Sequence, residues 1–268
     1  MDNAVCSLVS RIGCVVADID RFEADMFVGQ LWQSVSELLF PTCCMACERK
    51  LLQEEQVICS SCLASIVRTE HAILADNGID MLFAELIKEL GRRVRYEKGG
   101  AWGYYNRERG QVLRSLIERG KYGVRPQAEV FAYLGEMAAR EYIDSDFFDD
   151  IDVLVPVPLH PRRLRERGFN QAEWICRGMS KVLGVEVDTE HLYRVRNNAH
   201  QAQTSFDKRL VNTEDLFAIR YPEEWKDKHI LLVDDVITSG ATLLSCMRQL
   251  TPIRGCKASV FALGWAHD

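Results

Sequence analysis

The sequence predicts an α/β fold with a twisted, mostly parallel sheet that is covered by helices. From residue 151 onward, apolar β-branched runs alternate with helical patterns: IDVLVPVP, NQAEWICRGMSKVLG, HILLVDD, GATLLSCMRQL and KASVFALGW. Runs of this kind are typical of parallel strands buried on both faces. Upstream, AWGYYN at 101–106 predicts a further strand, and residues 110–142 predict two helices separated near GKYGVRPQ. In such a sheet the ligand crevice lies beyond the carboxyl ends of the strands, where both Pro156 and Asp234 fall.

Length and composition limit the classes of protein to consider. The 268 residues suffice for one large domain and a small module. With 47% apolar and 27% charged residues, the chain has the composition of a soluble globular protein. The net charge of -6 argues against a general nucleic-acid coat and leaves a local basic patch open. We expect no membrane span and no secretory signal, because neither a run of about 18 apolar residues nor a basic leader is present, and hence a cytoplasmic location.

The chain is expected to contain three parts. Residues 1–40 form an N-terminal helical segment, residues 41–66 a small zinc ribbon, and residues 67–268 the α/β domain. The helix prediction rests on apolar residues at helical spacing before a proline: Phe27, Leu31, Val35, Leu38, Leu39 and then Pro41.

The cysteine module has the spacing of a metal site. CCMACERKLLQEEQVICSSC contains two C-x2-C pairs separated by eleven residues: Cys44 with Cys47, and Cys59 with Cys62. Four thiolates at about 2.3 Å from a zinc ion leave no position for water, so the zinc would be structural. In a protein that is not exported, a disulfide framework is not expected. Cys43 stays open as the alternative to Cys44, and buried or redox-active thiol pairs are the other interpretation.

The stretch LLVDDVITSGATL at 231–243 carries the strongest chemical signal. The strand HILLV would deliver Asp234 and Asp235 to the carboxyl edge of the sheet, and TSGAT would turn the chain into a helix that begins near Thr242. Backbone N–H groups of such a turn suit a phosphate dianion, and Gly240 lets the backbone come close. The two carboxylates suit the vicinal hydroxyls of a sugar and help to hold a divalent cation. Together these groups describe a site for a ribose 5-phosphate.

Three other interpretations of this stretch compete. A Walker A loop requires Gly-x4-Gly-Lys-Ser/Thr, which is absent. A phosphorelay receiver domain also carries VDD after an apolar strand, but near its start, whereas only 34 residues follow Asp234. In the third interpretation the stretch is only a strand followed by an N-capped helix, and the two acids have no role in binding.

Several motifs resemble those of a known family. The two acids followed by TSGAT resemble the 5-phosphoribosyl-1-pyrophosphate (PRPP) motif of type I phosphoribosyltransferases. VPVPLHPRRLRERGFNQA at 155–172, RVRNNAHQAQT at 194–204 and the four-cysteine ribbon together resemble the ComF family, which groups competence-associated and GntX-like proteins. The resemblance covers residues 38–265, and the order of the motifs along one chain makes it specific.

The resemblance implies roles for individual residues. Asp234 and Asp235 would hold the ribose 2- and 3-hydroxyls, and with Arg163 and Arg167 they would form the catalytic set. Magnesium would accompany PRPP. The other PRPP-binding residues would be the pyrophosphate loop of Pro156, Val157, Pro158 and Leu159, and the phosphate cradle of Thr238, Ser239, Gly240, Ala241 and Thr242. Lys121 is a further candidate, for which an ordinary surface lysine is the alternative. A further segment that could approach the site contains Arg194, Arg196, His200 and Gln203.

The basic segment RRLRERGFNQ is open to three interpretations. Its arginines would neutralise a departing pyrophosphate from a mobile loop that closes over the site. In the second interpretation the arginines bind the phosphate backbone of a nucleic acid. In the third they are only a solvated run of charge. After this segment, Asn170 and Glu173 predict a capping box that starts the next helix.

Whether the site is catalytic stays open. Thr238 stands where purine-salvage phosphoribosyltransferases place an acidic base, which removes a purine-salvage interpretation, whereas orotate-type enzymes also have Thr there. Several members of the fold bind PRPP or nucleotides only for regulation. The first hypothesis is a phosphoribosyltransferase with an unknown acceptor. The second is a competence-type DNA-uptake accessory that binds single-stranded DNA or a helicase, with a regulatory or vestigial PRPP site.

Overall fold

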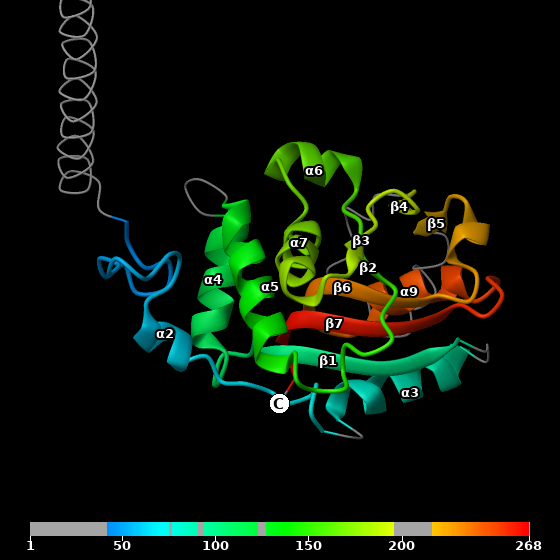
Figure 1. Ribbon diagram of the computed structural model, residues 1–268, viewed down its shortest axis with the longest axis horizontal. Helices are drawn as coiled ribbons and strands as arrows, with labels where there is room; N and C mark the ends of the chain where they lie inside the picture. The colour runs from blue at the N-terminus through cyan, green and yellow to red at the C-terminus, as the bar shows by residue number, and fades with distance from the viewer. Residues whose placement is uncertain (1–41, 75–76, 91–93, 123–126, 196–215, 268) are drawn as a thin grey trace, which may run out of the picture. The chain divides into compact units, whose positions relative to one another are not determined.

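The computed structural model describes residues 42–74, 77–90, 94–122, 127–195 and 216–267 (Figure 1). The predicted helical segment at 1–40 and the residues Arg196, His200 and Gln203 lie outside these ranges. The chain divides into two compact units, Met1–Cys59 and Ser60–Asp268. The domain boundaries at residues 40 and 66 stay predictions.

In the first unit, backbone hydrogen bonds fold residues 42–59 back on themselves. Cys43 and Lys50 form an isolated antiparallel bridge on either side of a tight turn. Met45 N donates to Val57 O at 3.0 Å, which brings the chain near the second cysteine pair alongside the first.

The second unit is built on a five-stranded sheet in the order β1-β7-β6-β2-β3. Its strands are β1 (Tyr96–Tyr104), β2 (Val153–Pro156), β3 (Glu186–Val187), β6 (His229–Ile237) and β7 (Lys257–Trp265). The ladders between these strands are all parallel, which confirms the predicted fold class. The central strands β6 and β7 are buried along nearly their whole length, as their continuous apolar runs indicated. The first four residues of AWGYYN fall in β1, which begins five residues earlier than predicted and ends at Tyr104.

Helices cover both faces of the sheet. On one face lie α3 (Gly78–Leu90) and α9 (Ala241–Leu250); on the other lie α4 (Gln111–Tyr122), α5 (Ala128–Tyr142) and α7 (Gln171–Leu183) (Figure 1). The helices α4 and α5 are the two predicted for residues 110–142. The shorter elements are α2 (Ser60–Ala64), α6 (Pro161–Arg167), the 3-10 helix η1 (Pro222–Trp225), and the antiparallel pair β4 (Leu192–Arg194) and β5 (Phe217–Ile219). Among the described residues, no helix combines the length and hydrophobicity needed to cross a bilayer.

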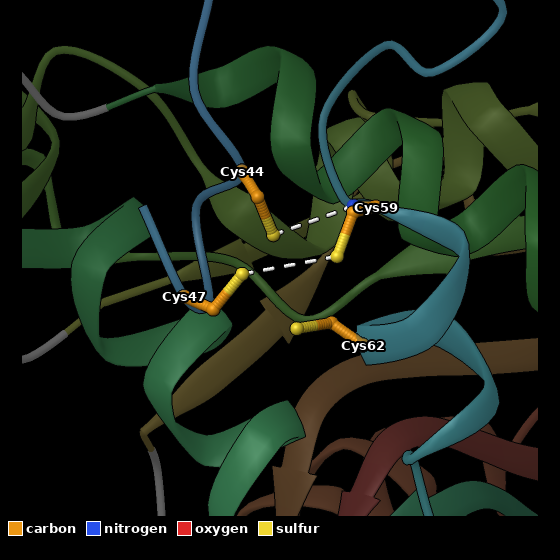
Figure 2. Close-up of side chains that lie close together, drawn as sticks. All are labelled: Cys44, Cys47, Cys59 and Cys62. Carbon is orange, nitrogen blue, oxygen red and sulfur yellow. Dashed lines mark hydrogen bonds between the residues drawn. The ribbon is translucent and has the colours of Figure 1, made fainter. Parts of the chain in front are cut away.

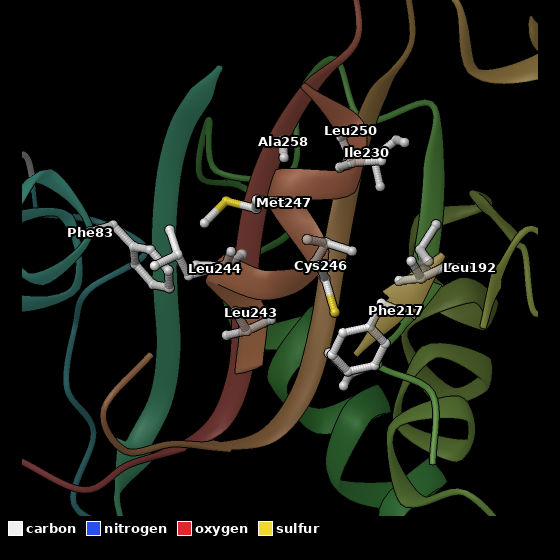
Figure 3. Close-up of a cluster of buried hydrophobic side chains, with 14 of the residues drawn as sticks. Phe83, Leu192, Phe217, Ile230, Leu243, Leu244, Cys246, Met247, Leu250 and Ala258 are labelled. Atoms are coloured by element: carbon white, nitrogen blue, oxygen red, sulfur yellow. The ribbon is translucent and has the colours of Figure 1, made fainter. Parts of the chain in front are cut away.

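One continuous core fills the space between α3, α9 and the sheet (Figure 3). Phe83 enters it from α3, and Leu244 and Met247 enter it from α9. Alternate sheet residues such as Leu232 point into this core, and because side chains alternate along a strand, their neighbours point to the opposite face. The burial of α9 fixes the start of that helix against the end of β6, where the acid pair lies.

Candidate functional site

The acid pair lies inside β6 rather than after it. The sequence predicted a strand that ends at Val233, but β6 runs through Asp234 and Asp235 to Ile237, because β7 continues to pair with it. On the other side of β6 the pairing stops earlier, since the last pair with β2 joins Pro156 to Val233. The two acids therefore stand where β6 has lost one neighbour, at the carboxyl end of the sheet. This is where the crevice of an open α/β sheet is expected.

Asp235 forms an ion pair with Lys121. The Lys121 Nζ lies 2.6 Å from Oδ2 of Asp235, and both side chains are largely buried, with 14% and 8% exposed. Lys121 belongs to the last turn of α4, so Asp235 points to the face of the sheet that α4 and α5 cover. The structure thus brings Lys121 to the acid pair, as the resemblance implied, and gives it a specific carboxylate partner.

Asp234 points to the opposite face, toward α9. Its charge adds to burial in raising the pKa of the Cys246 thiol on α9. Burial first and the neighbouring Asp235 second raise the pKa of Asp234 itself to about 7. The Asp235 backbone N–H, which donates to Asp234 Oδ1 at 2.8 Å, and the positive charges of Lys121 and Arg194 act against this increase. Asp234 is therefore a carboxyl group that gains or loses its proton near neutral pH.

Arg194 lies near Asp234 although it belongs to an element that is distant in sequence. Arg194 ends β4 and stacks on Phe217 of β5, with 5.5 Å between the guanidinium carbon and the ring centroid. Burial first and the charge of Arg163 second lower the pKa of Arg194. Arg194 thus places positive charge beside Asp234, and Arg163 lies close enough to Arg194 to act on it, which suits a polyanionic ligand.

The small-residue turn Thr238–Gly240 connects β6 to α9. The helix begins at Ala241, one residue before the predicted start. Gly240 has a φ of +70°, and a Cβ at this position would lie 3.0 Å from Leu86 on α3, so only glycine fits without strain. Gly240 also offers no side chain to cap α9. The first N–H groups of α9 have no acceptor within the helix, which is the arrangement that an anion requires.

The predicted pyrophosphate loop follows β2. Pro156 and Val157 are buried, and Val157 N donates to Val233 O at 2.8 Å, so the start of the loop is fixed against β6. Pro158 and Leu159 are half-buried. One of the three interpretations of the basic segment placed its arginines on a mobile loop. Residues 161–167 form the short helix α6, which starts with a proline and is capped by the His160 side chain.

The arginines of α6 differ in their contacts. Arg163 and Arg165 are exposed, and Arg162 pairs with Glu166 on the same helix at 2.9 Å. Arg167 instead donates to the Tyr122 hydroxyl at 3.1 Å and stacks on its ring, which links α6 to the end of α4.

The capping prediction that follows α6 is confirmed in part. Asn170 caps α7, because its side chain accepts from Ala172 N at 3.2 Å. The reciprocal half of the box is absent from the bonds of the described residues, since Glu173 accepts from Arg177 at 2.6 Å. Asn170 Nδ2 donates to Val157 O at 3.1 Å, so this cap is a second contact that fixes the start of the predicted pyrophosphate loop.

The cysteine cluster gathers the four predicted ligands (Figure 2). The sulfur atoms of Cys44, Cys47, Cys59 and Cys62 all lie within 4.8 Å of one another. Those of Cys47 and Cys59 are 3.8 Å apart, and two ligands of a tetrahedron with zinc–sulfur bonds of about 2.3 Å would be separated by about 3.8 Å. Cys44 rather than Cys43 belongs to the cluster, which resolves the alternative left open by the sequence. The donor set therefore fits a zinc ion with no position for water.

Backbone N–H groups favour the thiolate form of Cys44. Burial tends to raise the pKa of Cys44, but backbone N–H groups, led by that of Cys59 at 3.3 Å, outweigh burial and lower it. A lowered pKa favours the thiolate, which is the form that binds zinc.

Sequence reasoning missed two residues near the site. Tyr122 accepts a hydrogen bond from Arg167. In the sequence, only its position directly after Lys121 could have indicated that Tyr122 lies near the site. His267 contacts the carbonyl oxygen of Thr238. No local pattern could indicate this contact, because the pairing of β6 with β7 creates it.

The chain is thus an α/β protein with a parallel sheet covered by helices, and it carries a four-cysteine cluster near its N-terminus. No family model matches the chain. It is 28% identical over 218 residues to the DNA utilization protein YhgH of Escherichia coli (strain K12), a match that spans 80% of this chain and 92% of that protein. It is 25% identical over 225 residues to Competence protein F of Haemophilus influenzae, over 83% and 96% of the two chains. It is 26% identical over 268 residues to Competence protein ComFC of Bacillus subtilis, over 97% of each chain. These matches confirm the resemblance to the ComF family.

Solved structures with some likeness to the chain include phosphoribosyltransferases. The allosteric regulatory enzyme of purine biosynthesis is 17% identical with a TM-score of 0.33, over 53% of this chain and 29% of that chain. A hypoxanthine phosphoribosyl transferase of Trypanosoma cruzi is 14% identical with a TM-score of 0.30, over 50% of this chain and 63% of that chain.

Proposed function

We propose that the chain binds PRPP and transfers its phosphoribosyl group to an acceptor nucleophile. One observation carries the proposal: the acid pair of β6 stands where β2 has ended, and only Val236 and Ile237 separate it from the turn that Gly240 shapes. A sugar phosphate matches both halves of this arrangement, because carboxylates accept from hydroxyls and a helix N-terminus binds a phosphate. The resemblance to the PRPP motif supports the same ligand.

The acid pair would take the ribose diol. Asp234 is partly exposed and would meet the ring directly. Asp235 is held by Lys121, so full engagement of the diol would require this ammonium group to move from the carboxylate toward the ligand. A lysine released in this way would add positive charge where the pyrophosphate leaves. Lys121 would therefore bind PRPP as well as Asp235.

The pyrophosphate would lie near the end of β2. The loop from Pro156 to Leu159 would supply backbone donors, and Arg163 would supply positive charge from α6. Magnesium would enter with the pyrophosphate as part of the ligand. In the reaction, the bond between ribose C1 and the pyrophosphate oxygen breaks through an oxocarbenium-like state, and the acceptor then bonds to C1 and gives up a proton. Charge grows on the departing oxygen, so the nearby cations would stabilise the transition state.

Calorimetry with PRPP and magnesium tests the proposal. We expect binding to the wild type, and its loss in the double variant Asp234→Asn/Asp235→Asn. Glu97→Gln is the matched control, because Glu97 is an exposed acid on the edge strand of the same sheet. Separate titrations with ribose 5-phosphate and with pyrophosphate would test the two parts of the site. The first ligand tests the acid pair and the turn before α9, and the second tests the loop after β2. Absence of PRPP binding to the wild type would refute the proposal.

A second candidate function is binding of single-stranded DNA. The names of the relatives mention competence and DNA utilization. On this chain, α6 presents exposed arginines, and Tyr122 beside them is 74% exposed. Exposed aromatic rings next to arginines suit stacked bases and a phosphate backbone.

A salt titration with a single-stranded oligonucleotide tests the second candidate. The slope of log affinity against log salt should fall by about 0.7 for each phosphate contact that is removed. Arg163→Ala/Arg165→Ala should lower the slope, whereas Arg140→Ala on α5, where Arg140 pairs with Glu136, should not. A complex that is insensitive to both salt and the α6 variant would exclude this surface.

A further inference from the structure

The residues that follow β7 hold the turn that follows β6. Ala266 N donates to Ile237 O at 3.0 Å, and His267 Nε2 contacts the carbonyl oxygen of Thr238 one residue later. The His267 ring packs on Trp265, with 4.5 Å between centroids and 32° between planes. Trp265 is buried, so the imidazole of His267, which is otherwise exposed, packs on one buried ring.

The direction of this contact determines which way the next N–H group points. A carbonyl oxygen only accepts, so the Nε2 of His267 must carry the proton. In a planar trans peptide the C=O and the N–H point in opposite directions. Holding the Thr238 carbonyl toward His267 therefore turns the Ser239 N–H away from His267, to the other side of the turn. Gly240, with its positive φ, then leads directly into the first N–H groups of α9.

We propose that His267 is a positioning residue for the phosphate cradle: it fixes the Thr238–Ser239 peptide, so that the Ser239 N–H and the first N–H groups of α9 are arranged to receive the 5-phosphate of the ligand. The assignment of the ligand rests on the proposed function. The contact between His267 and Thr238 does not depend on any ligand. The two parts can therefore be tested separately.

Two variants separate the hydrogen bond from the packing. His267→Phe keeps an aromatic ring against Trp265 but removes the donor, and His267→Gln returns a donor without the ring. The readout that needs no ligand is the NMR order parameter of the Ser239 amide. We expect a value near 0.85 in the wild type, a value below about 0.6 in His267→Phe, and partial recovery in His267→Gln.

The readout that needs the ligand is the dissociation constant for PRPP compared with that for pyrophosphate alone. Loss of one donor to a phosphate should weaken PRPP about tenfold in His267→Phe and leave pyrophosphate unchanged, because pyrophosphate lacks the 5-phosphate. Equal PRPP affinity in His267→Phe and the wild type would overturn the positioning role. If the wild type bound no PRPP, the proposed function would fail, and the order parameter alone would decide: an unchanged Ser239 amide in His267→Phe would refute the contact.

Discussion

Replacing Asp234 by asparagine should stabilise the folded protein at neutral pH while it removes PRPP binding. Burial and the adjacent Asp235 raise the pKa of Asp234 from 3.8 to about 7 in the folded chain. In the unfolded chain the carboxyl group keeps a pKa of about 3.9. Between these two values the folded state holds a proton that the unfolded state has released, so this residue lowers stability as the pH rises from about 4 to about 7. An asparagine has no charge to desolvate, and its Oδ1 still accepts from Asp235 N.

The size of the effect follows from the difference in pKa. About three pH units at about 1.4 kcal/mol each give a ceiling of about 4 kcal/mol. The adjacent carboxylate shares the proton, and the side chain is only partly buried, so we expect about 1 to 2 kcal/mol at pH 8. For a domain of this size, that gain raises Tm by about 2 to 8 °C. At pH 5, where Asp234 is protonated in the folded state, the gain should be smaller.

Urea unfolding followed by circular dichroism, at pH 5 and at pH 8, measures this difference. The exposed acid Glu97 provides the control, because Glu97→Gln should leave stability nearly unchanged at both values of pH. The reasoning fails if Asp234→Asn destabilises the protein at pH 8, or if its gain is the same at both values of pH. Either result would mean that Asp234 does not carry the raised pKa.

Three further predictions concern the ion pair, the turn and the cysteine cluster. Lys121→Met leaves two adjacent carboxylates without their lysine partner and should lower the free energy of unfolding by about 2 to 4 kcal/mol in urea melts at pH 8, with partial recovery in Lys121→Arg. Gly240→Ala should cost about 1 to 2 kcal/mol and weaken PRPP, whereas Gly168→Ala, at a φ of +87° with open space around it, should cost less and leave PRPP binding unchanged. Purified protein should contain one zinc ion per chain by elemental analysis; Cys44→Ser should lose it and Cys256→Ser, elsewhere in the fold, should keep it, and a wild type free of zinc would contradict the assignment.

The fold class was predictable because its signal is local. Parallel strands that are buried on both faces appear in the sequence as continuous apolar runs, and the helices between them have their own period. The start of α7 at Asn170 was predictable for a similar reason, since a cap needs only neighbouring residues. The end of β6 was not predictable from the sequence. Its extension to Ile237 depends on pairing with β7, and a partner strand cannot be read from the strand itself.

The sequence by itself determined the chemistry of the site: two acids, a small-residue turn and four cysteines at metal spacing, each a matter of residue type and short spacing. The tertiary structure alone decided the geometry. In the folded chain Asp235 pairs with Lys121, and Asp234 points to the other face of the sheet. Cys44 rather than Cys43 joins the cysteine cluster, and His267 contacts the turn after β6. These contacts join elements that are far apart along the chain. Their formation depends on strand register and helix packing, which no local run of residues specifies.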